Sequence, residues 1–368
     1  MLGNMRVKEI FHSERDYWDK KVAEFKSVHP LNAFGWGNVR VVDGWKPVYL
    51  IAQKGETITG AVMVLTKPIP FTFLSIMYAP RGPILTSLSD IETLDALLKK
   101  IRIKARENHA IFIRIDPSIE EEAIPICNNP FIKQGFIHLK QRWTFWNTPR
   151  DVYRIALTKF NSEEELFRSL DKRVRTSVRK FCKQGLIIKL ATEKKEFQTF
   201  YSIFRKFSIE KGFMARGYEY QKALWDEFIA RGNGELLLAI YQGKIIGGAI
   251  RLIFGQKCLA MHRAIPHQYQ YLRANDAITW ESIRRAMAMG CQWYSFRGVG
   301  SSATEERFKK KYGPQWVSLT GYYDLPFYPF LYRLFYLVEF EILPRVWPVL
   351  MRIRKKLSEL INWLRSHS

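Results

Sequence analysis

Two stretches of the sequence, YLIAQKGETITGAVMVL at residues 49–65 and LLAIYQGKIIGGAIRLI at residues 237–253, align with each other without a gap. Gly55 coincides with Gly243 in this alignment, and each glycine stands between two apolar runs, which predicts a turn between two strands. The apolar alternation stays in phase across both copies, as the pleat of a strand requires. The chain therefore carries one predicted β-hairpin twice.

The elements after each hairpin also repeat. A predicted strand comes next, then a helical pattern (89–107 and 275–289), then a further strand (110–115 and 291–296). Glycine turns between apolar strands are common, so two unrelated hairpins are the alternative. The matching order favours duplication, and we expect an α/β fold with mixed sheets in two tandem units.

Length and composition agree with two folded domains. The chain has 368 residues, 47% of them hydrophobic and 14% aromatic, which excludes a disordered protein. The net charge is +23, and residues 151–325 hold 30 Lys and Arg against 17 Asp and Glu, or +13. Such an excess predicts a polyanionic partner, namely RNA, an anionic lipid surface or a phosphorylated substrate, unless it is only a basic surface.

The cysteines and the apolar runs predict the compartment. Cys127, Cys182, Cys258 and Cys291 show neither C-x-x-C spacing nor a paired framework, as expected for thiols in a reducing compartment. No signal peptide is recognisable, and the longest apolar run, 327–340, is too short to span a bilayer. We expect a cytoplasmic protein.

A candidate anion site lies in CQWYSFRGVGSSATEERFKKKYG, residues 291–313. An aromatic strand leads to a glycine turn at Arg297, and a short charged helix with Phe308 and Lys309 comes after it. The spacing G-x-G-x-x-A resembles a dinucleotide fingerprint, but the helix of about nine residues is short for a crossover. Coenzyme A is also disfavoured, because no glycine cradle precedes the helix at 275–289.

A second basic feature is the helix expected from Ser162 to about Gln184. Its segment 171–183 has six basic residues and one acid, which is typical of a nucleic-acid-facing surface, although a solvated helix face is the alternative. A strand is expected at 316–323. The aromatic and basic tail at 326–368 is expected either to dock on an anionic membrane or to pack on the first unit.

Several short motifs occur in an order that resembles the FemABX family of peptidoglycan interpeptide-bridge aminoacyltransferases. They are an aromatic turn at 36–40, YAPRGP at 78–83, Ile115-Asp116-Pro117, the basic helix, GFMAR at 212–216 and Phe308-Lys309. The resemblance covers residues 32–324 and implies two acetyltransferase-like (GNAT-like) subdomains that face each other across a cleft. Their expected bounds are 1–148 with 318–330 for the acceptor side and 149–317 for the donor side.

The same resemblance implies a reaction. An amino acid of the Gly, Ala or Ser type passes from aminoacyl-tRNA to the stem-peptide amine of a peptidoglycan precursor, either lipid II or UDP-MurNAc-pentapeptide. No cofactor and no metal are expected. Two alternatives remain: an N-acyltransferase of the same fold with another acyl donor, and a non-catalytic RNA-binding protein.

The matched positions imply a set of site residues. Lys309 is expected near the developing charge, with Phe308 as a wall of the site, although a solvated cation is the alternative for Lys309. Asp116 is expected to orient the attacking amine or to take its proton, or else only to cap a turn. The expected substrate-binding residues are Arg40 and Arg216 for phosphates, and Trp36, Arg81, Tyr220, His262 and Arg297. The expected tRNA-binding residues are Lys172, Arg175, Arg179 and Lys183.

Overall fold

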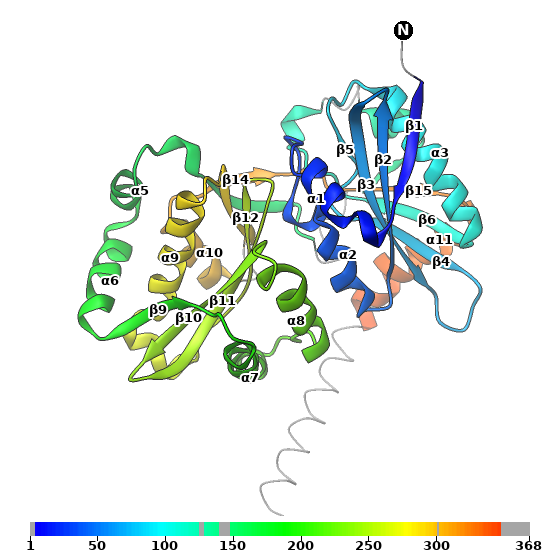
Figure 1. Ribbon diagram of the computed structural model, residues 1–368. Helices are drawn as coiled ribbons and strands as arrows, with labels where there is room; N and C mark the ends of the chain where they lie inside the picture. The colour runs from blue at the N-terminus through cyan, green and yellow to red at the C-terminus, as the bar shows by residue number, and fades with distance from the viewer. Residues whose placement is uncertain (1–3, 125–128, 140–147, 300–301, 347–368) are drawn as a thin grey trace, which may run out of the picture.

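The computed structural model describes residues 4–124, 129–139, 148–299 and 302–346, and it consists of two lobes, each built on one mixed sheet (Figure 1). The first sheet has the order β1 (Met5–Ile10), β2 (Lys46–Lys54), β3 (Thr57–Pro68), β4 (Ser75–Ala79), β6 (Ala110–Ile115), β15 (Tyr322–Pro326), β7 (Ile137–Leu139), and β5 (Ile84–Leu85) pairs with β3. The second has the order β14 (Gln315–Ser318), β8 (Asp151–Ala156), β13 (Trp293–Gly298), β12 (Lys257–Ala264), β11 (Lys244–Phe254), β10 (Gly234–Tyr241), β9 (Leu186–Leu190).

The duplicated hairpins are β2–β3 and β10–β11, and they occupy the same place in the two sheets. In each lobe the strand after the hairpin, β4 or β12, pairs antiparallel with the second strand of the hairpin. A helix follows, and the strand after that helix pairs parallel with β4 or β12: β6 with β4, and β13 with β12. The helices between them are α3 (Ile91–Glu107) and α9 (Ala274–Ala288). The predicted α/β fold with two copies of one unit is confirmed.

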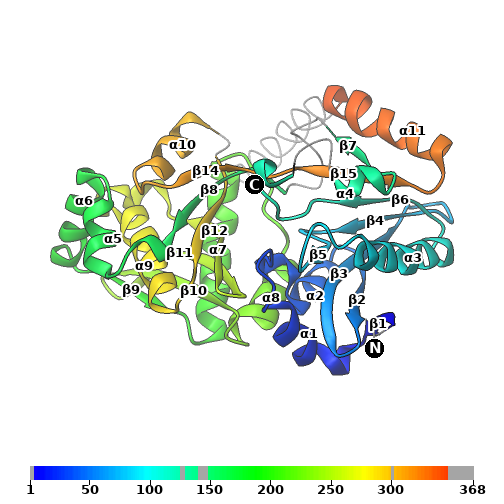
Figure 2. The same cartoon turned by 90° about the horizontal axis from the view of Figure 1, so that it is seen from above.

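The two lobes exchange strands. The chain leaves β7 in the first sheet and enters the second as β8, between β13 and β14; it leaves β14 and returns as β15, between β6 and β7. The orange strand β15 therefore lies among the blue and cyan strands of the first lobe (Figure 2). The prediction of one strand at 316–323 is wrong, because Gly321, at φ 82°, lies where the chain passes between the sheets.

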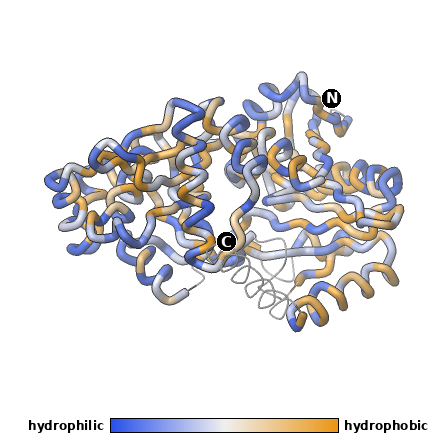
Figure 3. The backbone as a smooth tube through the Cα atoms, turned by 90° about the horizontal axis from the view of Figure 1, so that it is seen from below, coloured by the Kyte–Doolittle hydropathy of each residue, from blue (hydrophilic) through white to orange (hydrophobic). Residues whose placement is uncertain are grey.

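Helices cover both faces of each sheet, and the strands between them are largely apolar (Figure 3). The remaining helices are α1 (Arg15–Val22), α2 (Phe34–Val41), α4 (Pro130–Lys133), α5 (Glu163–Ser169), α6 (Lys172–Lys183), α7 (Lys194–Glu210), α8 (Tyr218–Leu224), α10 (Ala303–Lys310) and α11 (Pro329–Leu337). One apolar core contains side chains of α1 and α2 together with those of α7 and α8, among them Trp18, Phe34, Phe200 and Leu224. The lobes thus share a core.

Residues 34–41, expected as an aromatic turn, form helix α2. The glycines suggested a turn, but Gly37 is required by close packing: a Cβ there would lie 2.0 Å from the Tyr49 hydroxyl oxygen. The Tyr49 hydroxyl donates to the Phe34 carbonyl oxygen at 2.7 Å. Trp36 and Arg40, four residues apart, consequently lie on one face of a helix.

The basic helix is also divided. Leu170 has extended backbone angles, and Asp171 begins α6 by accepting a hydrogen bond from the Arg173 backbone N–H at 2.7 Å. The apolar stripe nevertheless packs as its spacing predicted, with Leu166, Val174 and Val178 in one core.

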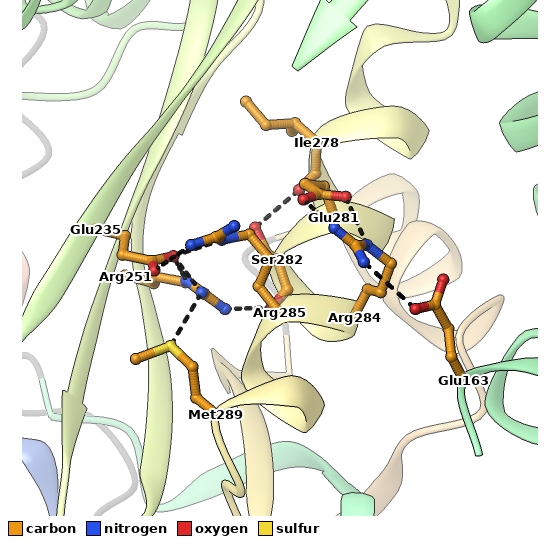
Figure 4. Close-up of polar contacts among 9 residues, drawn as sticks. All are labelled: Glu163, Glu235, Arg251, Ile278, Glu281, Ser282, Arg284, Arg285 and Met289. Carbon is orange, nitrogen blue, oxygen red and sulfur yellow. Dashed lines mark hydrogen bonds and ion pairs between the residues drawn. The ribbon is translucent and has the colours of Figure 1, made fainter. Parts of the chain in front are cut away.

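An arginine network fixes α9 to the sheet beneath the second lobe's cleft (Figure 4). Buried Arg251 on β11 donates to Glu235 on β10 at 2.9 Å and to the Ser282 carbonyl oxygen on α9. Arg285 donates to the other oxygen of Glu235 at 2.8 Å. These charge-assisted bonds fix the position of α9 relative to β10 and β11.

The predicted C-terminal tail begins as α11 and continues as a π-helix, Val338–Ile342. Buried Arg114 on β6 anchors it, donating to Asp324 at 2.7 Å and to Glu339 at 2.7 Å. Residues 347–368, and 140–147 of the strand pattern expected at 136–146, lie outside the described residues. No helix within the described ranges is long and apolar enough to cross a membrane.

Candidate active site

A cleft of about 1230 Å³ opens in the second lobe. Its walls come from β11, β12, β13, α9 and α10, and the first lobe contributes Tyr322 of β15. The charged side chains among its lining residues are Arg150, Lys211, Arg251, Arg263, Arg273, Arg297, Lys309 and Lys311 against Asp151, Asp276 and Glu305. This excess of cations suits an anionic ligand.

Lys309 lies in the cleft wall and is 6% exposed. Ser302 begins α10 by accepting from the Glu305 N–H, and the helix turns Lys309 back toward β13. Its Nζ donates to the Gly298 carbonyl oxygen at 2.7 Å and lies 2.7 Å from Glu305 Oε1. Burial lowers the pKa of Lys309, while Glu305 opposes that shift.

Phe308 lies beside Lys309 in the same wall of the cleft. Its ring is 5.4 Å from that of Tyr312, and the Arg263 guanidinium lies 4.3 Å from its centroid. Tyr312 donates to Asp276 Oδ1 at 3.0 Å. Asp276 is a buried carboxylate of the cleft wall, and among the described residues it has no ion-pair partner within 4.0 Å.

Arg297 and His262 also line the cleft. Arg297 has φ 68°, and its backbone N–H donates to Ser295 Oγ at 3.1 Å. Burial lowers the pKa of His262 to about 3, and the charges of Arg297 and Arg216 add to the effect, so the imidazole is neutral at physiological pH. His262 Nε2 has no hydrogen-bond partner among the described residues.

Arg40 and Arg216 meet outside this cleft, at the junction of the lobes. Arg40 Nη1, from the last turn of α2, lies 3.0 Å from Asp43 Oδ2, and Arg216 Nη1, from the loop before α8, lies 3.0 Å from the same oxygen. Lys67 is close enough for all three charges to act on its pKa. Three cations around one carboxylate leave an excess of positive charge, which is suitable for phosphate oxygens.

Trp36 and Tyr220 support this cationic group. The Arg40 guanidinium lies 6.0 Å from the Trp36 ring, and the Arg216 guanidinium lies 5.2 Å from the Tyr220 ring. Both aromatic side chains are buried. The predicted phosphate-binding arginines are thus brought together, each over an aromatic ring.

Asp116 and Arg81 form a buried pair behind the cleft wall. Asp116 Oδ1 accepts from the Arg81 backbone N–H at 2.7 Å, and its Oδ2 lies 3.7 Å from Arg81 Nε. Burial raises the pKa of Asp116 to about 6, although Arg81 opposes the shift. Arg81 Nη2 donates to the Pro149 carbonyl oxygen at 2.8 Å, and Pro149 itself lines the cleft. Asp116 does not line the cleft, so its predicted contact with the amine stays a prediction.

The expected tRNA-binding residues lie on α6. Lys172, Arg179 and Lys183 are exposed, while Arg175 donates to the Arg168 carbonyl oxygen at 3.0 Å. The Arg179 guanidinium lies 5.5 Å from the Phe167 ring. The α6 face is basic and accessible, separate from the residues that line the cleft.

Sequence reasoning missed Asp43, Arg263 and Asp276. Asp43 stands three residues after Arg40, and this spacing was a usable signal. Asp276 and Arg263 gave none, because only the fold places α9 and β12 beside α10. No group of three or more His, Cys, Asp or Glu suited to a metal ion occurs in the described part of the chain.

Comparison with known proteins decides the family. The sequence matches the FemAB family over residues 16–242 and 241–339. The chain belongs to the FemAB family. A lipid II:glycine glycyltransferase of Staphylococcus haemolyticus (strain JCSC1435) is 24% identical over 229 residues, which are 60% of this chain and 53% of that protein. The chain spans about half the length of the curated relatives it matches.

Solved structures agree on the fold of this FemAB protein. A crystal structure of FemX matches with a TM-score of 0.80 and 18% identity, over 89% of this chain and 99% of that one. A tandem GNAT protein from the clavulanic acid biosynthesis pathway matches with a TM-score of 0.53 and 9% identity, over 88% of this chain and 98% of that one. The expected tandem GNAT-like fold is therefore confirmed.

Proposed function

We propose that this FemAB protein transfers an amino acid from aminoacyl-tRNA to the stem-peptide amine of a peptidoglycan precursor. The observation that carries the proposal is the cationic cleft with Lys309 in its wall, in a chain whose relatives include lipid II:glycine glycyltransferases. The reaction forms a C–N bond and breaks the ester C–O bond. The amine loses a proton, and the released 3′-hydroxyl of the tRNA gains one.

The donor end lies in the cleft in this proposal. Lys309 faces the oxyanion that forms when the amine attacks the ester carbonyl, and burial makes its charge more effective than it would be in water. Phe308 excludes water from the same place. Asp276 accepts from the α-ammonium group of the aminoacyl ester, because that group is the cation which a buried carboxylate in the wall would bind best.

The acceptor enters from the junction of the lobes. Arg40 and Arg216 hold its phosphates, and Asp43 keeps both guanidinium groups directed at one point until phosphate oxygens replace it. Relatives are named for lipid II, and we take the lipid-linked precursor as the acceptor, with contact between α11 and the membrane. Arg81 and Asp116 position the wall at Pro149.

The tRNA body lies along α6. Each cation that neutralises a phosphate makes binding more dependent on salt, because it releases a counterion. Removing two such cations in Arg175→Ala with Arg179→Ala should therefore weaken tRNA binding and flatten its salt slope. Binding that is unchanged at several salt concentrations would remove this surface from the account.

Turnover assays separate the three candidate functions. The protein is mixed with a stem-peptide precursor and, in parallel reactions, with glycyl-, alanyl- or seryl-tRNA or with acyl-coenzyme A. Amide product with a charged tRNA supports the proposal. Product only with acyl-coenzyme A identifies an N-acyltransferase with another donor, and tRNA binding without product identifies an RNA-binding protein.

A further inference from the structure

The loop between β3 and β4 exposes two phenylalanines, of which Phe73 touches only the edge of the fold, its ring lying 5.7 Å from that of His109. Phe71 is 106% exposed and Phe73 is 78% exposed. Phe71 also has φ 63°, a conformation that is costly for a side chain of this size. An aromatic ring that is exposed to solvent on a residue with an unfavourable backbone conformation suggests a surface that a membrane or another molecule covers.

The loop is held in a fixed shape. The Ile69 N–H donates to the Leu74 carbonyl oxygen at 2.8 Å, and Thr72 Oγ1 donates to the Ile69 carbonyl oxygen at 2.9 Å. Ile69 and Leu74 point inward and pack in one cluster with Leu331 and Phe335 of α11. Internal packing thus uses one side of the loop and leaves the two phenylalanines outward.

Helix α11 lies beside this loop (Figure 2). It also carries an apolar stripe on its outer face. Phe330 is 80% exposed, Leu334 54% and Leu337 48%, at the i, i+4, i+7 spacing of one helix face. Because Leu331 and Phe335 already occupy the inner face, the outer stripe is not needed to hold the helix. The loop and the helix that carry these exposed apolar side chains pack into one internal apolar cluster through Ile69, Leu74, Leu331 and Phe335.

Cations border this surface. Lys67 precedes the loop on β3, Arg333 is exposed on α11, and Lys46 is exposed at the start of β2. The charges of Arg40, Asp43 and Arg216 act on Lys67, so the strand that leads into the loop passes near the proposed phosphate site. Exposed apolar rings on elements that also carry cations match the interface of an anionic bilayer, whereas a second copy of this chain would bring like charges together.

We propose that the 69–74 loop and the outer face of α11 dock together on a bilayer that contains anionic lipid, with the rings of Phe71, Phe73 and Phe330 in its interfacial region. Docking here places the phosphate site at the membrane surface, where a lipid-linked acceptor lies. The delivery of a lipid-linked acceptor to the phosphate site rests on the proposed function, whereas the docking of this surface on a bilayer does not.

Vesicle flotation of the full chain tests the proposal, with phosphatidylcholine vesicles that contain or lack phosphatidylglycerol. Wild type should float with the anionic vesicles, and F71S/F73S should partition about tenfold or more weakly, since transferring one phenylalanine contributes at least that factor. Ile187→Ser is the matched control, because Ile187 is 59% exposed on β9 of the other lobe. All three proteins should melt at the same temperature.

Equal flotation of F71S/F73S and wild type would overturn the proposal. So would the absence of wild-type flotation together with self-association that F71S/F73S abolishes, which would assign the surface to a second copy. In turnover, F71S/F73S should lose activity on a lipid-linked acceptor in vesicles and keep it on a water-soluble one. If neither acceptor is used by wild type, the proposed function fails while flotation still decides the docking surface.

Discussion

Replacing Lys309 by methionine removes one cation from the cleft wall with little change in side-chain volume. Lys309 is only 6% exposed and donates to the Gly298 carbonyl oxygen, so water cannot readily take its place. Loss of one group that stabilises an oxyanion in a desolvated site lowers kcat by about 10²–10³. Its ion-pair partner Glu305 is 37% exposed at the side chain and can be solvated instead, so the loss of stability should stay near 1 kcal/mol.

Lys310 supplies the matched control. It pairs with Glu306 at 2.8 Å with the same i, i+4 spacing as Lys309 and Glu305, but its side chain is 59% exposed. Single-turnover rates with glycyl-tRNA should therefore fall about 10²–10³-fold in Lys309→Met and change less than about twofold in Lys310→Met. Lys309→Arg, which keeps the charge, should retain more activity than Lys309→Met. Equal rates for Lys309→Met and wild type would refute the role given to this cation.

Three further predictions concern the other groups. Arg216→Ala should raise KM for the acceptor about tenfold and leave single-turnover chemistry nearly unchanged, because a phosphate contact remote from the ester contributes mainly to binding; a fall in kcat alone would argue against a phosphate site. Asp276→Asn should narrow the preference for glycyl-tRNA over N-acetylglycyl-tRNA, since acetylation removes the ammonium charge, and an unchanged preference would remove Asp276 from the donor site. Burial raises the pKa of Asp116 to about 6 in the folded protein, above its ordinary value of 3.8. Its contribution to the free energy of unfolding is therefore present at low pH and is lost as pH rises through 6. In urea titrations, wild type should lose up to about 3 kcal/mol of unfolding free energy relative to Asp116→Asn between pH 4 and 7, and parallel plots of unfolding free energy against pH for the two proteins would contradict the burial argument.

The architecture was predictable from the sequence because both copies of the repeat show the same alternation of apolar residues and the same glycine position. Gly55 and Gly243 mark the same turn in both hairpins, and the order of later elements repeats with them. The exchange of β8 and β15 was only partly visible. A run such as 316–323 has the same local pattern whether it stays in one sheet or divides between two, and the difference depends on long-range pairing.

A candidate site could be proposed from the sequence where charge and motif coincide, as at Lys309, whose role stays a prediction, and not where tertiary contacts determine the surroundings. Arg40 was expected on a turn, yet it lies on a helix, because Gly37 has no side chain and so lets the Tyr49 hydroxyl pack against that helix. Asp116 was expected either to orient the attacking amine or only to cap a turn, and the sequence did not show that it would lie behind the wall at Pro149 with Arg81 as its partner. Asp276 carries no signal in the sequence, since its position in the wall results from the fold, which brings α9 beside Tyr312.

Mass spectrometry of the acceptor after reaction tests the central claim most directly. The protein is incubated with glycyl-, alanyl- or seryl-tRNA and a lipid-linked stem-peptide precursor, and the peptide is released and fragmented. We predict one added aminoacyl residue, in amide linkage to the stem-peptide amine, and a strongly reduced amount of that product with Lys309→Met. An unmodified stem peptide with every charged tRNA would contradict the account.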